Sequence, residues 1–206
     1  MIKKTNDIDN KYDKKTNDID ISINDINNYA KFISLINKDS LNDFKSFNDF
    51  KSFINEGIKK YFYKEIRNMK LLYQASIDGF KNENFHKNCD GKKYTIILIV
   101  IENNNDNIII WGFTEIEWDS NWHTKEGNKR FIFSFSEKKI YYNKNKYLIY
   151  WSKYLGPDFF EIFYIDEKTG FRYQDSSYEY FDISAKDLVG KDEFSIKDYA
   201  VFQIDI

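Results

Sequence analysis

His86 and Cys89 are the residues of this sequence with the most suggestive chemistry, because they lie three positions apart in one short stretch. A reactive cysteine needs exposure and a lowered pKa, which nearby positive charges provide, and Lys87, Lys92 and Lys93 lie close by in the sequence. Cys89 is the only cysteine, so oxidation of its thiol would stop at sulfenic acid or a mixed disulfide. A buried cysteine that packs as a small apolar side chain is the commoner arrangement. A redox role for Cys89 and a packing role both remain open.

A metal site at the same place would need more ligands than the stretch supplies. Zinc sites generally use three or four nitrogen or sulfur ligands. Besides His86 and Cys89, the chain offers only His123 and carboxylates. We therefore predict no metal and no other cofactor, and we interpret His86 as a structural residue that holds a helix against a strand.

Glu115 and Glu117 are two residues apart in a predicted strand, which would place their carboxylates on one face, about 7 Å apart. That separation is typical of the paired carboxylates of glycoside hydrolysis. Glutamates on the wet face of a strand are also commonplace, and the sequence contains no glycine-rich phosphate loop and no Ser-His-Asp arrangement. No catalytic residue is assigned.

The elements that must position His86 and Cys89 follow one another closely. The sequence predicts a strand from Leu71, a turn at Asp78-Gly79, and a short helix capped by Asn82 with Phe85 on its inner face. After a second turn, residues 94–102 form an apolar run, which is typical of a strand with both faces covered.

The first 65 residues are predicted to form an extension in two parts. Residues 1–23 contain KKTNDID twice and are predicted to be disordered. That repeat fits replication slippage or a charged interaction tail. Residues 24–65 are predicted to be helical, beginning with an apolar stripe over residues 26–36.

A second repeat, NDFKSF, lies within the predicted helical region at residues 42–53 and places phenylalanine at every third position. A three-residue step winds around a helix, so these rings cannot all face one core. The repeat fits a slipped duplication or a partner-binding helix pair. Gly57 is predicted to break this helix, with a further helix over residues 58–69.

From residue 71 onward the apolar pattern is that of short antiparallel strands. We predict one hairpin from residues 94–102 and 108–118, with a bulge or a close backbone contact at Gly112. A second hairpin is predicted from residues 139–143 and 147–151, and a last strand over residues 199–206. The predicted fold class is α+β: two antiparallel β-sheets packed as a sandwich and flanked by helices, with a helical N-terminal extension. Residues 66–206 are predicted to form the sandwich domain.

Composition and charge narrow the function classes. The 206 residues carry a net charge of −2 with acidic and basic residues interspersed, so no nucleic-acid partner is predicted. The single cysteine fits a reducing compartment. The longest apolar run is too short to span a bilayer, so no membrane insertion is predicted. We expect a cytoplasmic protein.

The residues from 71 onward resemble one family, the TLDc domain. LLYQASIDGF, NFH, CDGK and a TIILI strand follow one another in the family's order, and GFT at residues 112–114, FIFSF at 131–135, GPDF at 156–159 and YAVFQI at 199–204 continue the series. The resemblance covers about residues 66–206. The matching positions, interpreted as structural, are Asp78, Gly79, Phe85, His86, Cys89, Asp90, Gly112, Trp118, Gly156, Pro157, Phe159 and Phe202.

The resemblance implies a β-sandwich that acts by protein–protein contact, with a role in resistance to oxidative stress through binding the vacuolar-type proton ATPase. It implies no catalytic residue. Two alternatives from other classes remain: a thiol-dependent antioxidant enzyme that uses Cys89, and a β-sandwich that binds small ligands.

Overall fold

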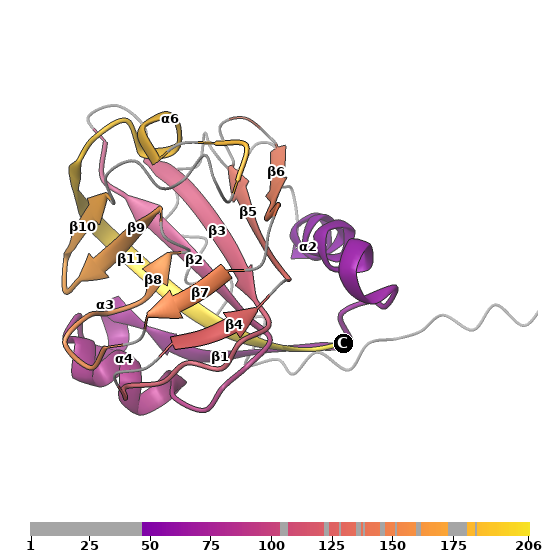
Figure 1. Cartoon of the computed structure of the whole chain (residues 1–206), viewed down its shortest axis with the longest axis horizontal. Coiled ribbons are helices and arrows are strands. Elements are labelled where there is room, and N and C mark those ends of the chain that lie inside the picture. The colour runs from indigo at the N-terminus through magenta and orange to yellow at the C-terminus, as the bar shows by residue number, and fades with distance from the viewer. Residues whose placement is uncertain are drawn as a thin grey trace, which may run out of the picture.

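The computed structural model describes residues 47–103, 107–121, 124–127, 129–134, 137, 139–144, 147–150, 152–159, 162–172, 181–183 and 185–206 (Figure 1). Within these residues the fold is mostly β, with a few short helices and one main antiparallel sheet. The region predicted to be disordered, the helix predicted over residues 26–36, and His123 lie outside the described residues.

Most of the secondary-structure elements in this part of the chain are antiparallel strands. They are β1 (Asn68–Gln74), β2 (Thr95–Ile101), β3 (Ile108–Thr114), β4 (Thr124–Gly127), β5 (Arg130–Ser134), β6 (Lys139–Tyr142), β7 (Tyr147–Tyr150), β8 (Asp158–Phe159), β9 (Phe163–Asp166), β10 (Thr169–Arg172) and β11 (Glu193–Asp205). The main sheet has the order β6-β5-β3-β2-β11-β10-β9-β8, and β1 joins it by pairing with β11. β4 and β7 form a separate two-stranded ribbon.

Strand β11 connects the two halves of the main sheet. Its residues from Ile196 to Gln203 pair with β2 along one edge, while the other edge pairs first with β10 and then with β1. A register shift between Ile196 and Asp198 marks the point of exchange. The antiparallel, β-rich character that we predicted is confirmed, but hydrogen bonding joins the strands into one main sheet because β11 belongs to both halves.

Four helices in the described ranges accompany the strands: α2 (Phe47–Phe62), α3 (Ala75–Asp78), α4 (Asn82–Cys89) and α6 (Ala185–Val189). Figure 1 shows α2 beside β5 and β6, whereas α3 and α4 lie together near β1. The predicted break at Gly57 is wrong, because α2 continues through it. A Cβ atom at Gly57 would lie 2.6 Å from the Phe131 ring, so this glycine is where the backbone of α2 rests on β5.

The helix predicted over residues 58–69 is confirmed only as far as Phe62, where α2 ends, and is wrong beyond it, since β1 begins at Asn68. Met69 and Leu71 lie opposite Ile204 and Phe202 of β11. The pairing of β1 with β11 therefore outweighs the helical spacing of apolar residues that predicted a helix as far as residue 69.

Two hydrophobic clusters cover the two faces of β2. Ile97, Ile99 and Ile101 belong to one cluster, which also contains α4 and β9 residues. The alternating residues Ile96, Leu98 and Val100 belong to the other, which contains Ile54 and Ile58 of α2. The unbroken apolar run of β2, predicted to be covered on both sides, is confirmed.

Local pairing departs from the prediction at two places. Strands β6 and β7 do not form a hairpin, because β6 pairs with β5 and β7 pairs with β4. The bulge predicted at Gly112 is absent from the pairs that the structure describes: β3 keeps a regular register through Gly112 with both β2 and β5. Glycine at this position leaves the ladder intact.

Replacing Tyr63 with glycine should raise the free energy of unfolding by about 1 kcal/mol. Tyr63 follows α2 with φ of 54°, a left-handed conformation that strains a residue with a Cβ atom, and its side chain is 91% exposed. Little packing is lost with the ring. Urea unfolding would measure the change; a lower stability would show that the ring makes contacts worth more than the strain.

Candidate functional site

His86 is the centre of a set of hydrogen bonds around α4. Its ring is 7% exposed. Nδ1 lies 2.8 Å from Asp90 Oδ1, and Nε2 lies 3.1 Å from the Ser152 oxygen and 2.9 Å from the Leu155 oxygen. His86 therefore ties α4 to residues 152–156, not to a strand as we predicted.

Asn82 acts beside His86, one helical turn earlier on the same face of α4. Its Nδ2 donates to the Tyr154 oxygen at 2.8 Å and to Asp166 Oδ1 at 2.9 Å. The predicted capping role of Asn82 is wrong: the N-cap position is Lys81, and no side-chain cap bond forms there. The amide of Asn82 joins α4 to the loop at residues 152–156 and to the end of β9 instead.

The Gly156-Pro157 turn is fixed between α4 and β9. Gly156 N donates to the Ile165 oxygen at 2.8 Å, and Ile165 N donates to the Pro157 oxygen at 3.1 Å. A Cβ atom on Gly156 would lie 2.9 Å from that Ile165 oxygen and 3.0 Å from Asn82 Oδ1, so only glycine fits without a shift. Phe159 follows in β8, opposite Phe163.

Asp198 carries a fully buried carboxylate at the register shift of β11. It accepts hydrogen bonds from Gln74 Nε2 (2.8 Å), Ser76 N (3.0 Å), Ser76 Oγ (2.7 Å) and Tyr199 N (2.8 Å). Asp78 Oδ2 accepts from Gln74 N at 2.8 Å. Both carboxylates therefore fasten the turn around α3, and Gly79, with φ of 93°, completes it.

Tyr73 and Tyr199 form a buried pair, and the Tyr73 ring packs against Phe85 of α4. Tyr73 Oη donates to the Gly79 oxygen at 2.7 Å, which leaves Tyr199 Oη as the donor to Tyr73 Oη at 3.1 Å. Burial raises the pKa of Tyr73 to about 12 and raises the pKa of Tyr199 as well. Both phenols therefore stay protonated near neutral pH and serve as hydrogen-bond donors.

Cys89 lies in the hydrophobic cluster that also contains Tyr73 and Tyr199, and it is 0% exposed. Burial raises the pKa of its thiol, and the carboxylate of Asp90 adds to the shift. A reactive thiol needs the opposite on both counts. The redox role of Cys89 stays a prediction, and the folded state gives it no support.

Thiol labelling tests this environment. We expect the Cys89 thiol of the native protein to react with a disulfide reagent at least about a hundredfold more slowly than in urea, because labelling has to wait for local opening. Comparable rates in the two states would show that the thiol is accessible. Peroxide consumption that is lost in Cys89→Ser would then revive the thiol-dependent enzyme.

Trp118 and Phe202 are buried side chains, and Gly112 lies within β3 between β2 and β5. Trp118 Nε1 donates to Thr95 Oγ1 at 2.8 Å, and its ring meets that of Phe85 edge to face at 5.2 Å. Phe202 is 3% exposed in the cluster on the α2 side of the sheet.

Glu115 and Glu117 do not share a strand face, because β3 ends at Thr114. Glu117 Oε1 lies 2.7 Å from Lys125 Nζ, and this hydrogen bond lowers the pKa of Glu117. Glu115 Oε1 accepts from Lys129 N at 3.1 Å. The arrangement that suggested glycoside hydrolysis is therefore not formed.

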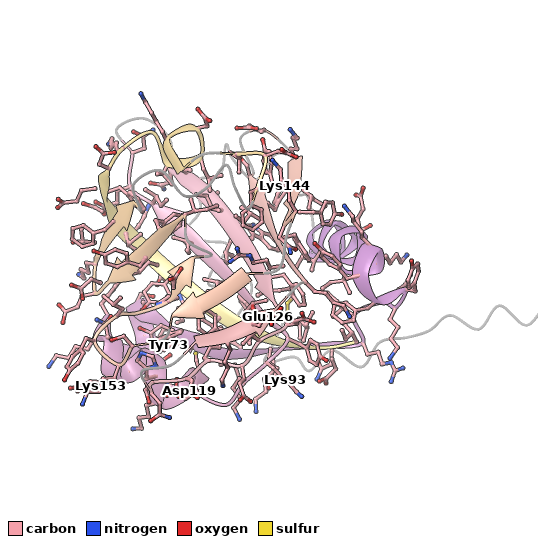
Figure 2. All side chains as sticks on the ribbon, viewed as in Figure 1. Tyr73, Lys93, Asp119, Glu126, Lys144 and Lys153 are labelled. Carbon is pink, nitrogen blue, oxygen red and sulfur yellow. The ribbon has the colours of Figure 1, made fainter. Side chains whose placement is uncertain are left out.

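Two surface depressions flank these elements. One is lined by residues of α4 and of the neighbouring loops, namely Glu83, His86, Lys87, Asp90, Ser120, Lys153 and Tyr154. The other lies near the start of β11 and includes Glu102, Lys191, Glu193 and Lys197. Figure 2 shows Lys153 at the periphery next to α4, with Tyr73 further inside.

Groups of three or more metal-ligating side chains do not occur in the described part of the chain. Sequence reasoning missed three contributors to the network: Asn82 as a loop anchor, Asp198 and Tyr199. The four-residue spacing of Asn82 and His86, which places both on one face of a short helix, could have indicated the role of Asn82. An aspartate placed directly before the apolar run Tyr199–Phe202 was the signal for the second.

Comparison with known proteins gives one family match. The model of the TLDc domain matches residues 35–205. This range includes α2, which we had placed in a separate helical extension. A search of curated proteins finds no matching sequence. In the ranges that the structure describes, no helix is long and apolar enough to cross a membrane.

Proposed function

The chain belongs to the TLDc domain family, and from that premise we propose that it works by binding another protein and carries no catalysis of its own. The observation that supports this proposal is the use of its reactive side chains within the fold. His86 is bonded at both ring nitrogens, and Cys89 is buried. These are the residues that first suggested chemistry, and their contacts hold α4 in place.

The partner that we propose is the vacuolar-type proton ATPase, with a role in resistance to oxidative stress in the cytoplasm. The support is the family resemblance carried by the ordered motifs from Leu71 to Phe202. The proposal does not depend on Cys89, since a binding domain needs only a stable surface.

A binding experiment with purified components tests the partner. The immobilised chain is exposed to the ATPase, intact and as its isolated peripheral sector, with ATP and with ADP. We expect saturable binding to at least one form. A β-sandwich domain of similar size and charge from another family serves as control, and the proposal fails if the chain binds none of the forms better than this control.

A finer proposal concerns the fold: the two halves of the main sheet face each other as the layers of a sandwich. Residues from β9, including Ile165, belong to the same hydrophobic cluster as Ile97 and Ile99 of β2, although these strands are not neighbours in the sheet. Methyl–methyl NOEs between β9 and β2 are expected, and their absence from a fully assigned spectrum would contradict the layered arrangement.

A further inference from the structure

We infer that the junction between α4 and residues 152–156 is a proton-dependent latch, closed by the doubly protonated ring of His86. The inference concerns regulation of the fold and does not depend on which partner the chain binds. It starts from the hydrogen-bonding capacity of the groups around the ring.

Each ring nitrogen of His86 faces acceptors. Nδ1 lies 2.8 Å from a carboxylate oxygen of Asp90. Nε2 lies 3.1 Å and 2.9 Å from the backbone oxygens of Ser152 and Leu155. Carbonyl oxygens only accept, as does an ionised carboxylate, whereas a neutral imidazole carries one N–H group and the imidazolium carries two. All three contacts are therefore hydrogen bonds only when both nitrogens are protonated.

Loss of one proton has to open one side of the ring. If the remaining proton stays on Nε2, the Nδ1 lone pair faces the Asp90 carboxylate. If it stays on Nδ1, the Nε2 lone pair faces two carbonyl oxygens. Either arrangement replaces attraction by repulsion between acceptors, so deprotonation weakens the junction at Asp90 or at residues 152–156.

The charged groups around His86 come from α4 and its C-terminal end, from residues 152–156 and from the end of β9. On α4 and at its C-terminal end, Glu83 and Asp90 favour the positive ring, while Lys87 opposes it. From residues 152–156, Lys153 opposes it, and Tyr154, 69% exposed, is the neighbouring titratable phenol. Cys89 is buried on α4, and Asp166 is held by Asn82. The Asp90 carboxylate is the charged group in direct hydrogen-bond contact with the ring, whereas both lysines are exposed.

The latch acts on residues 152–156, which have few other side-chain hydrogen bonds to α4. Residues 152–156 contain no strand, and the bond from Asn82 Nδ2 to the Tyr154 oxygen is their other side-chain tie to this helix. At the opposite end of the ring, Asp90 forms an isolated bridge with Trp118, and Gly91 N donates to the Trp118 oxygen at 2.9 Å. The protonation state of one side chain thus bears on two loops at the same surface depression.

Amide hydrogen exchange at residues 154–156 tests the latch. The readout is the protection factor, which divides out the intrinsic dependence of exchange on pH. Between about pH 5 and 8, where histidine titrates, protection should fall about tenfold as pH rises, the factor that one hydrogen bond to a charged group is worth. Ring 15N shifts, recorded in parallel, should show both nitrogens protonated wherever protection is high.

Matched variants separate His86 from other titrating groups. The chain has two histidines, so His123→Gln should keep the fall in protection, and His86→Gln should remove it, since the Gln amide can still donate to the carbonyls but does not titrate. Asp90→Asn keeps an acceptor for Nδ1 and removes the charge, so it should move the fall to lower pH; it also serves if His86→Gln does not fold.

Four results would overturn the latch. They are a protection factor that stays flat in the wild-type protein, a fall that persists in His86→Gln, an unchanged transition in Asp90→Asn, and a singly protonated ring at pH values where residues 154–156 are protected.

Discussion

Replacing Asp198 with alanine should lower the free energy of unfolding by about 3 kcal/mol, because several buried hydrogen-bond donors lose their acceptor at once. The carboxylate accepts from the Gln74 amide, from Ser76 through N–H and hydroxyl, and from Tyr199 N–H. Asp198 is 0% exposed, so water cannot replace the lost acceptor without opening the structure. Urea unfolding monitored by circular dichroism would measure the loss.

Two substitutions control the Asp198 experiment. Asp198→Asn should cost less than alanine, because the buried Gln74 Oε1, which has no hydrogen-bond partner, can turn to accept from the new amide. Asp205→Ala removes an exposed carboxylate from the C-terminal end of the same strand and should change stability by less than about 0.5 kcal/mol. Similar effects for Asp198→Ala and Asp205→Ala would show that the buried network contributes little.

Replacing Phe85 with alanine should destabilise the fold by about 3–5 kcal/mol, the usual cost of removing a buried aromatic ring. The Phe85 ring is 0% exposed. It meets the ring of Tyr73 at 5.9 Å, that of His86 at 5.1 Å and that of Trp118 at 5.2 Å, each close to edge to face. The cavity left by alanine would remove the contacts of α4 with Tyr73 of β1 and with Trp118.

Phe85→Leu is the matched control, because it keeps much of the volume and should cost less than about 1.5 kcal/mol. The two midpoints in urea, compared at equal slope, give the difference directly. If alanine costs no more than leucine, the surrounding side chains collapse into the space and Phe85 is not the anchor of α4.

The parts of the fold that sequence reasoning predicted well are those set by local patterns. The apolar run from Thr95 to Ile101 predicted a strand covered on both faces, and the Asp78-Gly79 turn follows from the freedom of glycine at positive φ. The inward placement of Phe85 on the predicted short helix is also confirmed. In these cases neighbours in the sequence decide the conformation.

The parts that escaped prediction depend on partners far away in the sequence. Strands β6 and β7 read as a hairpin, yet β7 pairs with β4, whose residues 124–127 are polar and carry no strand pattern. Asn82 has the residue type of a helix cap, but Tyr154 and Asp166 compete for its amide. Glu115 and Glu117 lie beyond the end of β3, which the apolar pattern alone does not mark. Tertiary pairing decides each of these, and one sequence does not display it.

The same contrast holds for the candidate site. The stretch that contains His86 and Cys89 drew attention through its residue types, and the structure brings these residues together with Asp78 and Gly79 around α3 and α4. The partners of His86 are two backbone oxygens from residues 152–156 and the Asp90 carboxylate, and Asp78 accepts from the Gln74 backbone N–H. A backbone acceptor can belong to any residue type, so the sequence does not identify it. The sequence therefore showed which side chains could take part in chemistry, but not that their hydrogen bonds hold α4 in place.

The place of β11 in the chain has a consequence for how the protein is made. This strand comes last among the strands, yet β1, β2 and β10 all pair with it. While a ribosome is still producing the earlier residues, β1 and β2 lack their shared neighbour and keep open, apolar edges that invite association between nascent chains. Contacts between residues as distant as Asn68 and Asp205 also raise the contact order, which slows folding. The synthesis of β11 therefore determines when the sheet can close, and the interval before it is when chaperones would matter most.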